Sequence, residues 1–238
     1  MIVQACLNGA RPPAYHPALP LDAQALAADA EAAVAAGASE LHVHPRGANG
    51  RESLAAGAID RAVAALRGRL PGTAIGVSTG AWIEGDGPPT LDAIRAWSVL
   101  PDYASVNLSE THAEDVIRLL LERGVGVEAG LAGAADAERL AGAGLAPFCL
   151  RLLVEIDEQD PAEAEAAADA VLRIVRPLGR PILLHGVDDR VWPFVGQAAA
   201  AGFSTRVGLE DGRHLPDGSE AGDNAALVAA ACRIMRPA

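Results

Sequence analysis

The chain has 238 residues, a formal net charge of −12 and 50% hydrophobic residues, but only 3% aromatic residues. A chain this long and this apolar buries a full core, and α/β barrels of about this length fold as one domain. The acidic balance, with a pI of about 4.9, argues against nucleic acids and anionic lipid as partners.

The three cysteines, Cys6, Cys149 and Cys232, are scattered through apolar segments without a CxxC pair. An odd number of isolated thiols is typical of a reducing compartment. The N-terminal segment MIVQACLNGARPP is too short and too soon interrupted for a signal peptide, and no apolar run approaches the roughly 20 residues that span a membrane. We therefore expect a soluble, cytoplasmic protein without a membrane partner.

Short β-rich apolar runs alternate with longer alanine-rich runs along the whole chain. The predicted strands are Ile2–Leu7, Glu40–His44, Ala74–Ser78, Tyr103–Asn107, Gly126–Glu128, Phe148–Val154, Ile182–His185 and Ser204–Gly208. The predicted helices are Asp22–Ala36, Ala56–Leu70, Leu91–Val99, His112–Arg123, Ala134–Ala143, Pro161–Val175, Arg190–Ala201 and Ser219–Met235. This alternation indicates a parallel sheet.

Eight such units without a leftover domain predict an α/β fold, a single (β/α)8 TIM barrel over residues 1–238. The alternative is an open doubly wound sheet, which usually has a glycine-rich phosphate turn after its first strand. Here that segment is CLNGAR, which is not GxGxxG, so we favour the barrel.

In such a barrel, function lies at the C-terminal ends of the strands. The polar residues expected to converge there are Asn8, Arg11, His42, His44, Arg46, Ser78, Thr79, Asn107, Ser109, Glu110, Glu128, Arg151, Glu155, His185, Arg206, Glu210 and Asp211.

His42-Val43-His44 is the sharpest local pattern among these residues. Residues i and i+2 of a strand point to the same side, so two imidazoles at this spacing can bind one metal ion. The alternative is two separate buried histidines that bond to backbone or carboxylate groups. The pattern is weak alone, and its position at the end of a barrel strand strengthens it.

Glu210 and Asp211 follow the apolar segment RVGL at the end of the last strand. Glu210 would add a carboxylate ligand to two histidines and leave open metal positions, with Asp211 as a base. Alternatively, the two acids simply begin a turn with Gly212. Arg206 would face the barrel if it pairs with Asp211 or with a substrate carboxylate, and would otherwise point outward.

Six segments in chain order together resemble the β-keto acid cleavage enzymes, whose founding activity is 3-keto-5-aminohexanoate cleavage in lysine fermentation. The segments are CLNGARPPAYHPALP, AGASELHVHPRGANGRESL, GVSTGAW, ASVNLSE, LLHG and TRVGLEDG. The resemblance extends to about Leu227, and HVHPR, STG and RVGLED in this order are jointly specific.

The resemblance implies a (β/α)8 barrel that binds a divalent metal ion, usually zinc. Such an enzyme condenses a β-keto acid with the co-substrate acetyl-CoA to give acetoacetate and a new CoA thioester. The metal ligands would be His42, His44 and Glu210, and Asp211 would be the general base working with Arg206. We also expect a homo-oligomer, either a dimer or a tetramer.

The same resemblance implies that Ser78, with its neighbours, matches the region that holds the carboxylate end of the keto acid. The residues expected to contact the substrate are Ser78, Thr79, Gly80, Asn107, Ser109, Glu110 and Arg11. On its own, Ser78-Thr79-Gly80 is equally typical of a plain strand-to-helix turn. Arg11 stands where the aminohexanoate enzyme has an acid, which predicts a neutral or anionic substrate side chain.

Two other functions remain open from the sequence. A metal-assisted aldolase or hydrolase would use the same ligands without CoA, and acetyl-CoA-dependent formation of acetoacetate separates it from the cleavage enzyme. A non-catalytic barrel that binds a metabolite or metal is the other alternative. The pair of Asp211 and Arg206 argues against it, because binding alone requires no base beside a metal.

Overall fold

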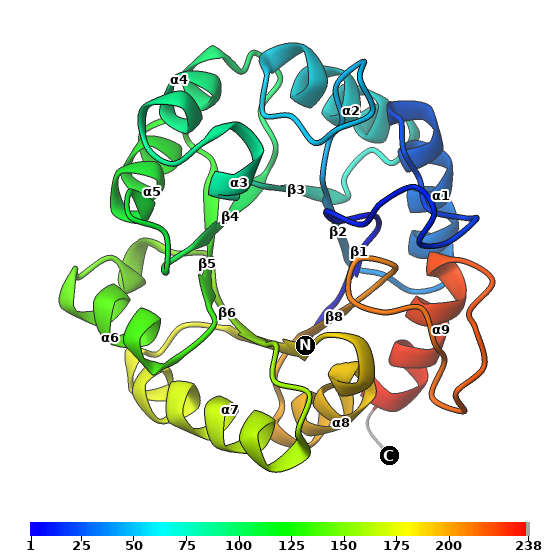
Figure 1. Cartoon of the computed structure of the whole chain (residues 1–238), viewed down its shortest axis with the longest axis vertical. Helices are drawn as coiled ribbons and strands as arrows, with labels where there is room; N and C mark the ends of the chain where they lie inside the picture. Colours follow the sequence, from blue (N-terminus) through cyan, green and yellow to red (C-terminus); the bar gives the residue numbers. More distant parts are fainter. Residues whose placement is uncertain (237–238) are drawn as a thin grey trace.

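Eight parallel strands form the inner wall of a barrel that helices surround, as Figure 1 shows for the computed structural model of the chain. The structure describes residues 1–236. The strands are β1 (Val3–Cys6), β2 (Glu40–Val43), β3 (Ala74–Ser78), β4 (Tyr103–Asn107), β5 (Gly126–Leu131), β6 (Arg151–Ile156), β7 (Ile182–Gly186) and β8 (Thr205–Val207).

The strands pair in parallel with their sequence neighbours from β1 to β7, and β8 pairs with β1. A bridge between Leu183 and Ser204 closes the seam between β7 and β8, and the amide of Leu184 donates to the carbonyl of Ser204 at 2.9 Å. The predicted single-domain TIM barrel is therefore confirmed, and the open doubly wound sheet is excluded.

The helices of the outer layer are α1 (Ala23–Ala35), α2 (Ala56–Arg69), α3 (Ala81–Glu84), α4 (Pro88–Ala96), α5 (Ala113–Glu122), α6 (Ala134–Gly142), α7 (Pro161–Val175), α8 (Val191–Ala201) and α9 (Asn224–Met235). Small buried residues such as Ala27, Ala30 and Ala33 of α1 let the helices lie close to the sheet. Within residues 1–236, no helix is long and apolar enough to cross a membrane.

Three predicted boundaries are wrong, and the local sequence explains two of them. Residues Ala146–Phe148 form a 3-10 turn instead of the start of β6, since the proline at position 147 suits the first positions of such a turn. Strand β5 continues three residues beyond the predicted end at Glu128. Helix α9 begins only after Asp223, whose side chain caps the helix by accepting from the amide of Ala226 at 2.8 Å.

Five polar residues, which we call the lower cluster, lie inside the barrel towards the N-terminal ends of the strands: Gln4, Glu40, Tyr103, Glu128 and Arg151. The amide nitrogen of Gln4 donates to Tyr103 Oη at 2.9 Å and to both carboxylates at 3.0 to 3.1 Å. Arg151 forms ion pairs with Glu40 and with Glu128, the latter at 2.7 Å. The cluster fills this end of the barrel with polar groups that bond to one another.

The lower cluster corrects the expectation that Glu128 and Arg151 lie at the mouth. Arg151 is the first residue of β6 and pairs in register with Glu128 in the middle of β5, so both lie below the strand ends. Gly76 makes room for this layer, because a Cβ there would come within 2.1 Å of the Tyr103 ring.

Candidate active site

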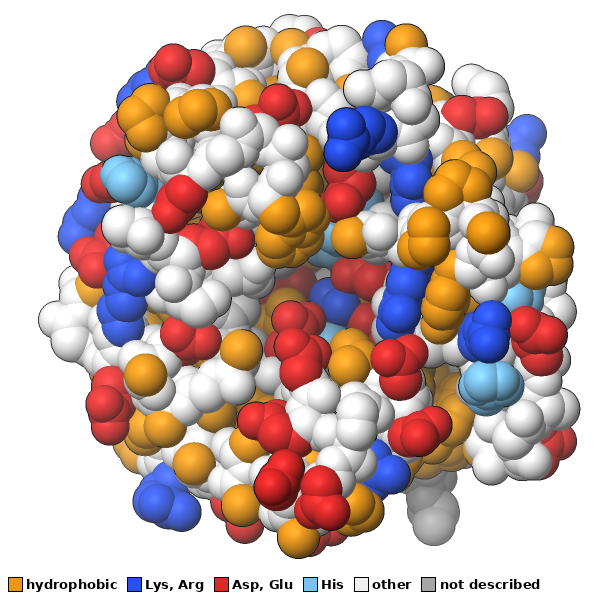
Figure 2. Space-filling model, in the orientation of Figure 1, with side chains coloured by type: hydrophobic (Ala, Val, Ile, Leu, Met, Phe, Trp, Pro, Cys, Tyr) orange, Lys and Arg blue, Asp and Glu red, His pale blue; other side chains and the backbone are white. Residues whose placement is uncertain are grey.

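A cavity of about 430 Å³ opens at the C-terminal ends of the strands, and Figure 2 shows this hollow with acidic and basic side chains on its walls. Its lining comprises Ala10, Arg11, Pro12, His42, His44, Ser78, Trp82, Ser105, Asn107, Leu153, Glu155, Asp157, Val187, Arg206, Glu210 and Asp211. Residues from the beginning, middle and end of the chain therefore meet at one mouth, as the sequence predicts for a barrel.

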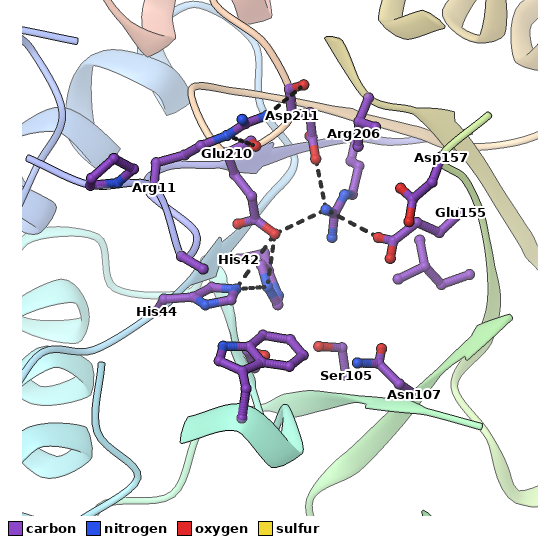
Figure 3. Close-up of a pocket in the computed structure, with 16 residues that line it drawn as sticks. Arg11, His42, His44, Ser105, Asn107, Glu155, Asp157, Arg206, Glu210 and Asp211 are labelled. Atoms are coloured by element: carbon purple, nitrogen blue, oxygen red, sulfur yellow. Dashed lines mark hydrogen bonds and ion pairs between the residues drawn. The ribbon is translucent and has the colours of Figure 1, made fainter. Parts of the chain in front are cut away.

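Three side chains at this mouth point their donor atoms toward one place (Figure 3). The Nε2 atoms of His42 and His44 lie 3.1 Å apart, and Glu210 Oε1 lies 3.6 and 3.5 Å from them. Two ligand atoms that each lie about 2.1 Å from one tetrahedral ion are separated by about 3.4 Å. The donor set therefore has the composition and spacing that could hold a divalent metal ion.

The electrostatics of this group favour a positive charge between the donors. Burial lowers the pKa of His42 to about 3, which keeps that ring neutral. Burial would lower the pKa of His44 as well, but Glu210 and Glu52 outweigh it and raise the pKa to about 9. Burial would raise the pKa of Glu210, but Arg206 and the two histidines hold it well below its ordinary value.

Glu52 and Trp82 fix the orientation of His44 from the side away from Glu210. Glu52 Oε1 lies 2.5 Å from His44 Nδ1, and the indole nitrogen of Trp82 donates to Glu52 Oε2 at 3.1 Å. The Trp82 ring is stacked on the imidazole, with centroids 6.4 Å apart. A carboxylate on Nδ1 leaves Nε2 free as the ligand atom.

The loop after β1 positions the backbone of two of these residues. Asn8 and the main chain of His44 exchange two hydrogen bonds of 2.9 Å. Gly9 lies against Glu210 with a φ of +52°, and a Cβ there would come within 2.5 Å of the Glu210 side chain. Only glycine fits this close approach without strain.

Glu210 also belongs to a group of five ionisable residues, which we call the mouth cluster: Glu155, His185, Arg206, Glu210 and Asp211. Arg206 is buried and faces the barrel, where its Nη2 lies 2.7 Å from Asp211 Oδ1, 2.9 Å from Glu210 Oε1 and 3.4 Å from Glu155 Oε2. His185 lies between two carboxylates, 3.0 Å from Glu155 Oε2 and 3.7 Å from Asp211 Oδ1. The outward alternative for Arg206 is thus excluded.

Asp211 differs from its neighbour Glu210 although both contact the same guanidinium. Burial raises the pKa of Asp211, and Arg206 and His185 oppose this only in part. Its Oδ2 atom is buried and has no hydrogen-bond partner among the described residues. Adjacent acids whose pKa values are driven apart suit two different roles, a permanently ionised ligand and a proton acceptor.

The structure brings some of the expected substrate residues into the cavity and leaves others outside its lining. Arg11, Ser78 and Asn107 line the cavity. Thr79, Gly80, Ser109 and Glu110 do not; Ser109 lines an adjoining hollow.

Two of the residues outside the lining have structural contacts instead. The hydroxyl of Thr79 donates to the carbonyl of Ser105 at 2.7 Å. Glu110 accepts hydrogen bonds from the amide of Ala81 at 2.8 Å and from the side chain of Asn107 at 3.2 Å.

Sequence reasoning gave no role to several residues of the site. Glu52 and Trp82 follow no periodic pattern, although both lie in segments that carry the family resemblance. Ser105 alternates with Asn107 on β4, so strand periodicity could have placed both on one side. Glu155 and His185 stood among the expected polar strand ends, but only the structure shows them beside Arg206.

The fold and this site define the chain as a (β/α)8 barrel with a candidate His/His/Glu metal centre at its mouth. The chain matches the family described as beta-keto acid cleavage enzyme over residues 1–238, and it belongs to that family. It is 24% identical over 260 residues to the 3-keto-5-aminohexanoate cleavage enzyme of Fusobacterium nucleatum, covering 99% of this chain and 91% of that enzyme. The predicted family is therefore confirmed.

Solved structures show the same barrel. The ternary complex of ObcA with a C4-CoA adduct and oxalate matches with a TM-score of 0.67 and 16% identity, covering 90% of this chain and 62% of ObcA. A 3-dehydroquinate dehydratase from Geobacillus kaustophilus matches with a TM-score of 0.63 and 13% identity over 98% of this chain and 89% of that one. At such identities the likeness establishes the fold alone.

Proposed function

We propose that this chain is a metal-dependent β-keto acid cleavage enzyme that uses acetyl-CoA and releases acetoacetate and a new acyl-CoA. The observation that carries the proposal is the convergence of His42, His44 and Glu210 with the pair of Arg206 and Asp211 on one cavity. Family membership supports it, as does the C4-CoA adduct bound by ObcA, whose fold is similar.

The chain's residues divide the work of binding the keto acid. The hydroxyls of Ser78 and Ser105 and the amide of Asn107 line the cavity and would donate to the carboxylate end. His42, His44 and Glu210 would hold a divalent ion, expected to be zinc, which when bound acts as a Lewis acid on the ketone.

Asp211 would take the proton from the carbon between the ketone and the carboxylate. Its buried Oδ2 faces no protein donor, and Arg206 at 2.7 Å from Oδ1 orients the carboxylate and offsets the developing charge. The carbanion attacks the acetyl thioester and CoA leaves as the thiolate. Attack of that thiolate on the original ketone breaks the bond between the ketone carbon and the newly acetylated carbon, which gives the new thioester. The electron pair stays on the acetylated carbon, which takes the proton back from Asp211 and becomes acetoacetate.

The test is to incubate zinc-loaded protein with acetyl-CoA and a panel of β-keto acids and to assay acetoacetate. Acetoacetate is expected only when acetyl-CoA is present. His44→Ala, which removes one of the proposed ligands, should lose the metal and the activity together. Turnover without acetyl-CoA would instead indicate an aldolase or hydrolase, and full activity of a metal-free protein would end the proposal. The homo-oligomer and the cytoplasmic location stay predictions.

A further inference from the structure

The cations that line the cavity are few, and their partners restrict what the cavity can bind. The chain contains no lysine, so arginines and histidines are its cationic side chains. The cavity lining includes two arginines, Arg11 and Arg206, and four carboxylates, which belong to Glu155, Asp157, Glu210 and Asp211. A divalent ion on the His/His/Glu donors would balance the two excess negative charges before any substrate enters.

The charge of Arg206 is already offset by carboxylates of the protein, although its Nε has no hydrogen-bond partner among the described residues. Its Nη2 atom already contacts carboxylates of Asp211, Glu210 and Glu155 at 2.7, 2.9 and 3.4 Å. A second anion beside this guanidinium would place a fourth negative charge around one positive charge, and displacing the buried Asp211 would leave that carboxylate unpaired.

Arg11 is turned toward the protein rather than held free for a ligand (Figure 3). Its Nε donates to the carbonyl of Glu210 at 2.9 Å, and its Nη2 donates to Asp188 Oδ1 at 2.9 Å. Asp188 also donates its amide to the carbonyl of Asp211 at 2.7 Å. Arg11 and Asp188 therefore clamp the backbone of the two acids from the loops after β1 and β7.

The backbone of Asp188 supports this structural assignment. Asp188 has a φ of +49°, and it is the one residue other than glycine in the left-handed region within residues 1–236. Such a conformation costs about 1 kcal/mol or more and persists where the surroundings require it. Here its amide and its carboxylate are both used, so the Arg11–Asp188 pair is part of the fold of the mouth.

A second hollow of about 330 Å³ continues the cavity past Trp82 and Asn107. It shares Glu155 and Asp157 with the cavity, adds Asp136, and has no arginine or histidine in its lining. Asp157 has no ion-pair partner within 4.0 Å among the described residues. The charged groups that a substrate side chain meets in this hollow are all carboxylates, and its other lining residues are neutral.

We propose that the cavity selects β-keto acids whose side chain carries no negative charge. This rests on the proposed function. It revises the sequence-based expectation of a neutral or anionic side chain by removing the anionic option, because Arg11 is bonded to Glu210 and Asp188. A second carboxylate on the substrate would face Glu155 and Asp157 without a free cation, and like-charge contacts of this kind reject a ligand.

The test compares two ligands that differ in charge but hardly in size, 3-oxoadipate and its C6 amide. Their dissociation constants for zinc-loaded protein are measured by calorimetry without acetyl-CoA, so that binding is separated from turnover. The amide is expected to bind at least about tenfold more tightly, which corresponds to about 1.4 kcal/mol. Equal or tighter binding of the dianion would overturn the proposal.

Two variants locate the cause of the selection. Asp157→Asn removes a carboxylate from the cavity wall, and Asp188→Asn releases Arg11 from its ion pair. Each variant should therefore reduce the preference for the amide over 3-oxoadipate, measured as the ratio of their dissociation constants, about three- to tenfold. Asp189→Asn, on the neighbouring exposed residue outside the cavity, is the matched control and should leave the ratio unchanged. A ratio unmoved by both test variants would contradict the proposal. If the amide binds preferentially but no acetoacetate forms with acetyl-CoA, the proposed function fails and the charge selection stands.

Discussion

The barrel interior holds two buried clusters of charge that look alike in composition. In the lower cluster, Arg151 pairs with Glu40 and Glu128. In the mouth cluster, Arg206 pairs with Glu155, Glu210 and Asp211. Both arginines are less than one-tenth exposed, so burial alone does not separate a structural cluster from a functional one.

The clusters differ in what their carboxylates face. Gln4 bridges Glu40, Glu128 and Tyr103 in the lower cluster, and none of these residues lines the cavity. In the mouth cluster, Glu210 and Asp211 line the cavity and each has an oxygen without a hydrogen-bond partner among the described residues. Glu128 Oε1 in the lower cluster lacks a partner as well, so it is the position on the cavity wall, rather than ion pairs or unpaired oxygens, that marks the reactive end of the barrel.

The largest expected effect is on turnover at the mouth. Asp211→Asn removes the proposed proton acceptor while Arg206 keeps its contacts with Glu210 and Glu155. We expect kcat to fall about 10³- to 10⁴-fold. The urea midpoint should stay within about 0.3 M of the parent, because no buried cation is left unpaired. Retention of more than a tenth of the activity would remove Asp211 from the mechanism.

In the lower cluster, we expect a substitution to reduce stability and to leave turnover nearly unchanged. Arg151→Met leaves Glu40 and Glu128 buried without their cation and should lower the free energy of unfolding by about 3 kcal/mol or more. The kcat of the folded fraction should stay within about threefold. Arg95→Met, which breaks an exposed ion pair with Asp92, is the matched control and should change stability by less than about 0.5 kcal/mol. A large loss of kcat in Arg151→Met would erase the distinction between the clusters.

A smaller effect, on zinc affinity, is expected when the Glu52 carboxylate that contacts His44 is replaced by a neutral amide. Glu52→Gln keeps the size of the side chain but weakens its hold on His44 Nδ1. The zinc affinity of the apoprotein should fall about 10- to 100-fold in a competition titration. Glu84→Gln, on an acid near Ser53 that does not touch His44, serves as control. Unchanged zinc affinity in Glu52→Gln would show that this contact does not orient the ligand.

The smallest effect concerns a half-buried acid, Asp29, that has an amide as partner instead of an arginine. Burial raises the pKa of Asp29 to about 7, although the side chain of Asn224 donates to it at 2.7 Å. An acid with a raised folded-state pKa stabilises the fold at low pH, and this contribution is lost as pH rises from about 4 through 7. Relative to Asp29→Asn, the parent should therefore lose on the order of 1 kcal/mol between pH 5 and pH 7. Parallel unfolding curves across this range would contradict the assignment.

Much of the fold follows from local sequence, because hydrophobic periodicity and helix length are short-range properties. Strand spacing places His42 and His44 together, and the end of the last strand places Glu210 near them. Glu128 lies below the mouth because β5 continues to Leu131. The residues after Glu128 are small or apolar, and this alone does not show whether they continue the strand or begin the loop.

Contacts made through loops could not be predicted. Glu52 reaches His44 because the loop folds back through a bridge between Arg46 and Glu52. The partner of Arg11 is Asp188, which lies 177 positions away in another loop. A local pattern can thus identify which groups reach the mouth, but not which of their charges are already paired.

The most direct test of the account follows the carbon atoms of acetyl-CoA. With acetyl-CoA labelled with ¹³C at both acetyl carbons, zinc-loaded protein and an accepted β-keto acid, acetoacetate should carry both labels in its methyl-ketone end, C3 and C4. The Asp211→Asn and His44→Ala proteins should form none above background. Unlabelled acetoacetate, or labelled product from the metal-free protein, would contradict the assignment of metal-dependent acetyl transfer to this mouth.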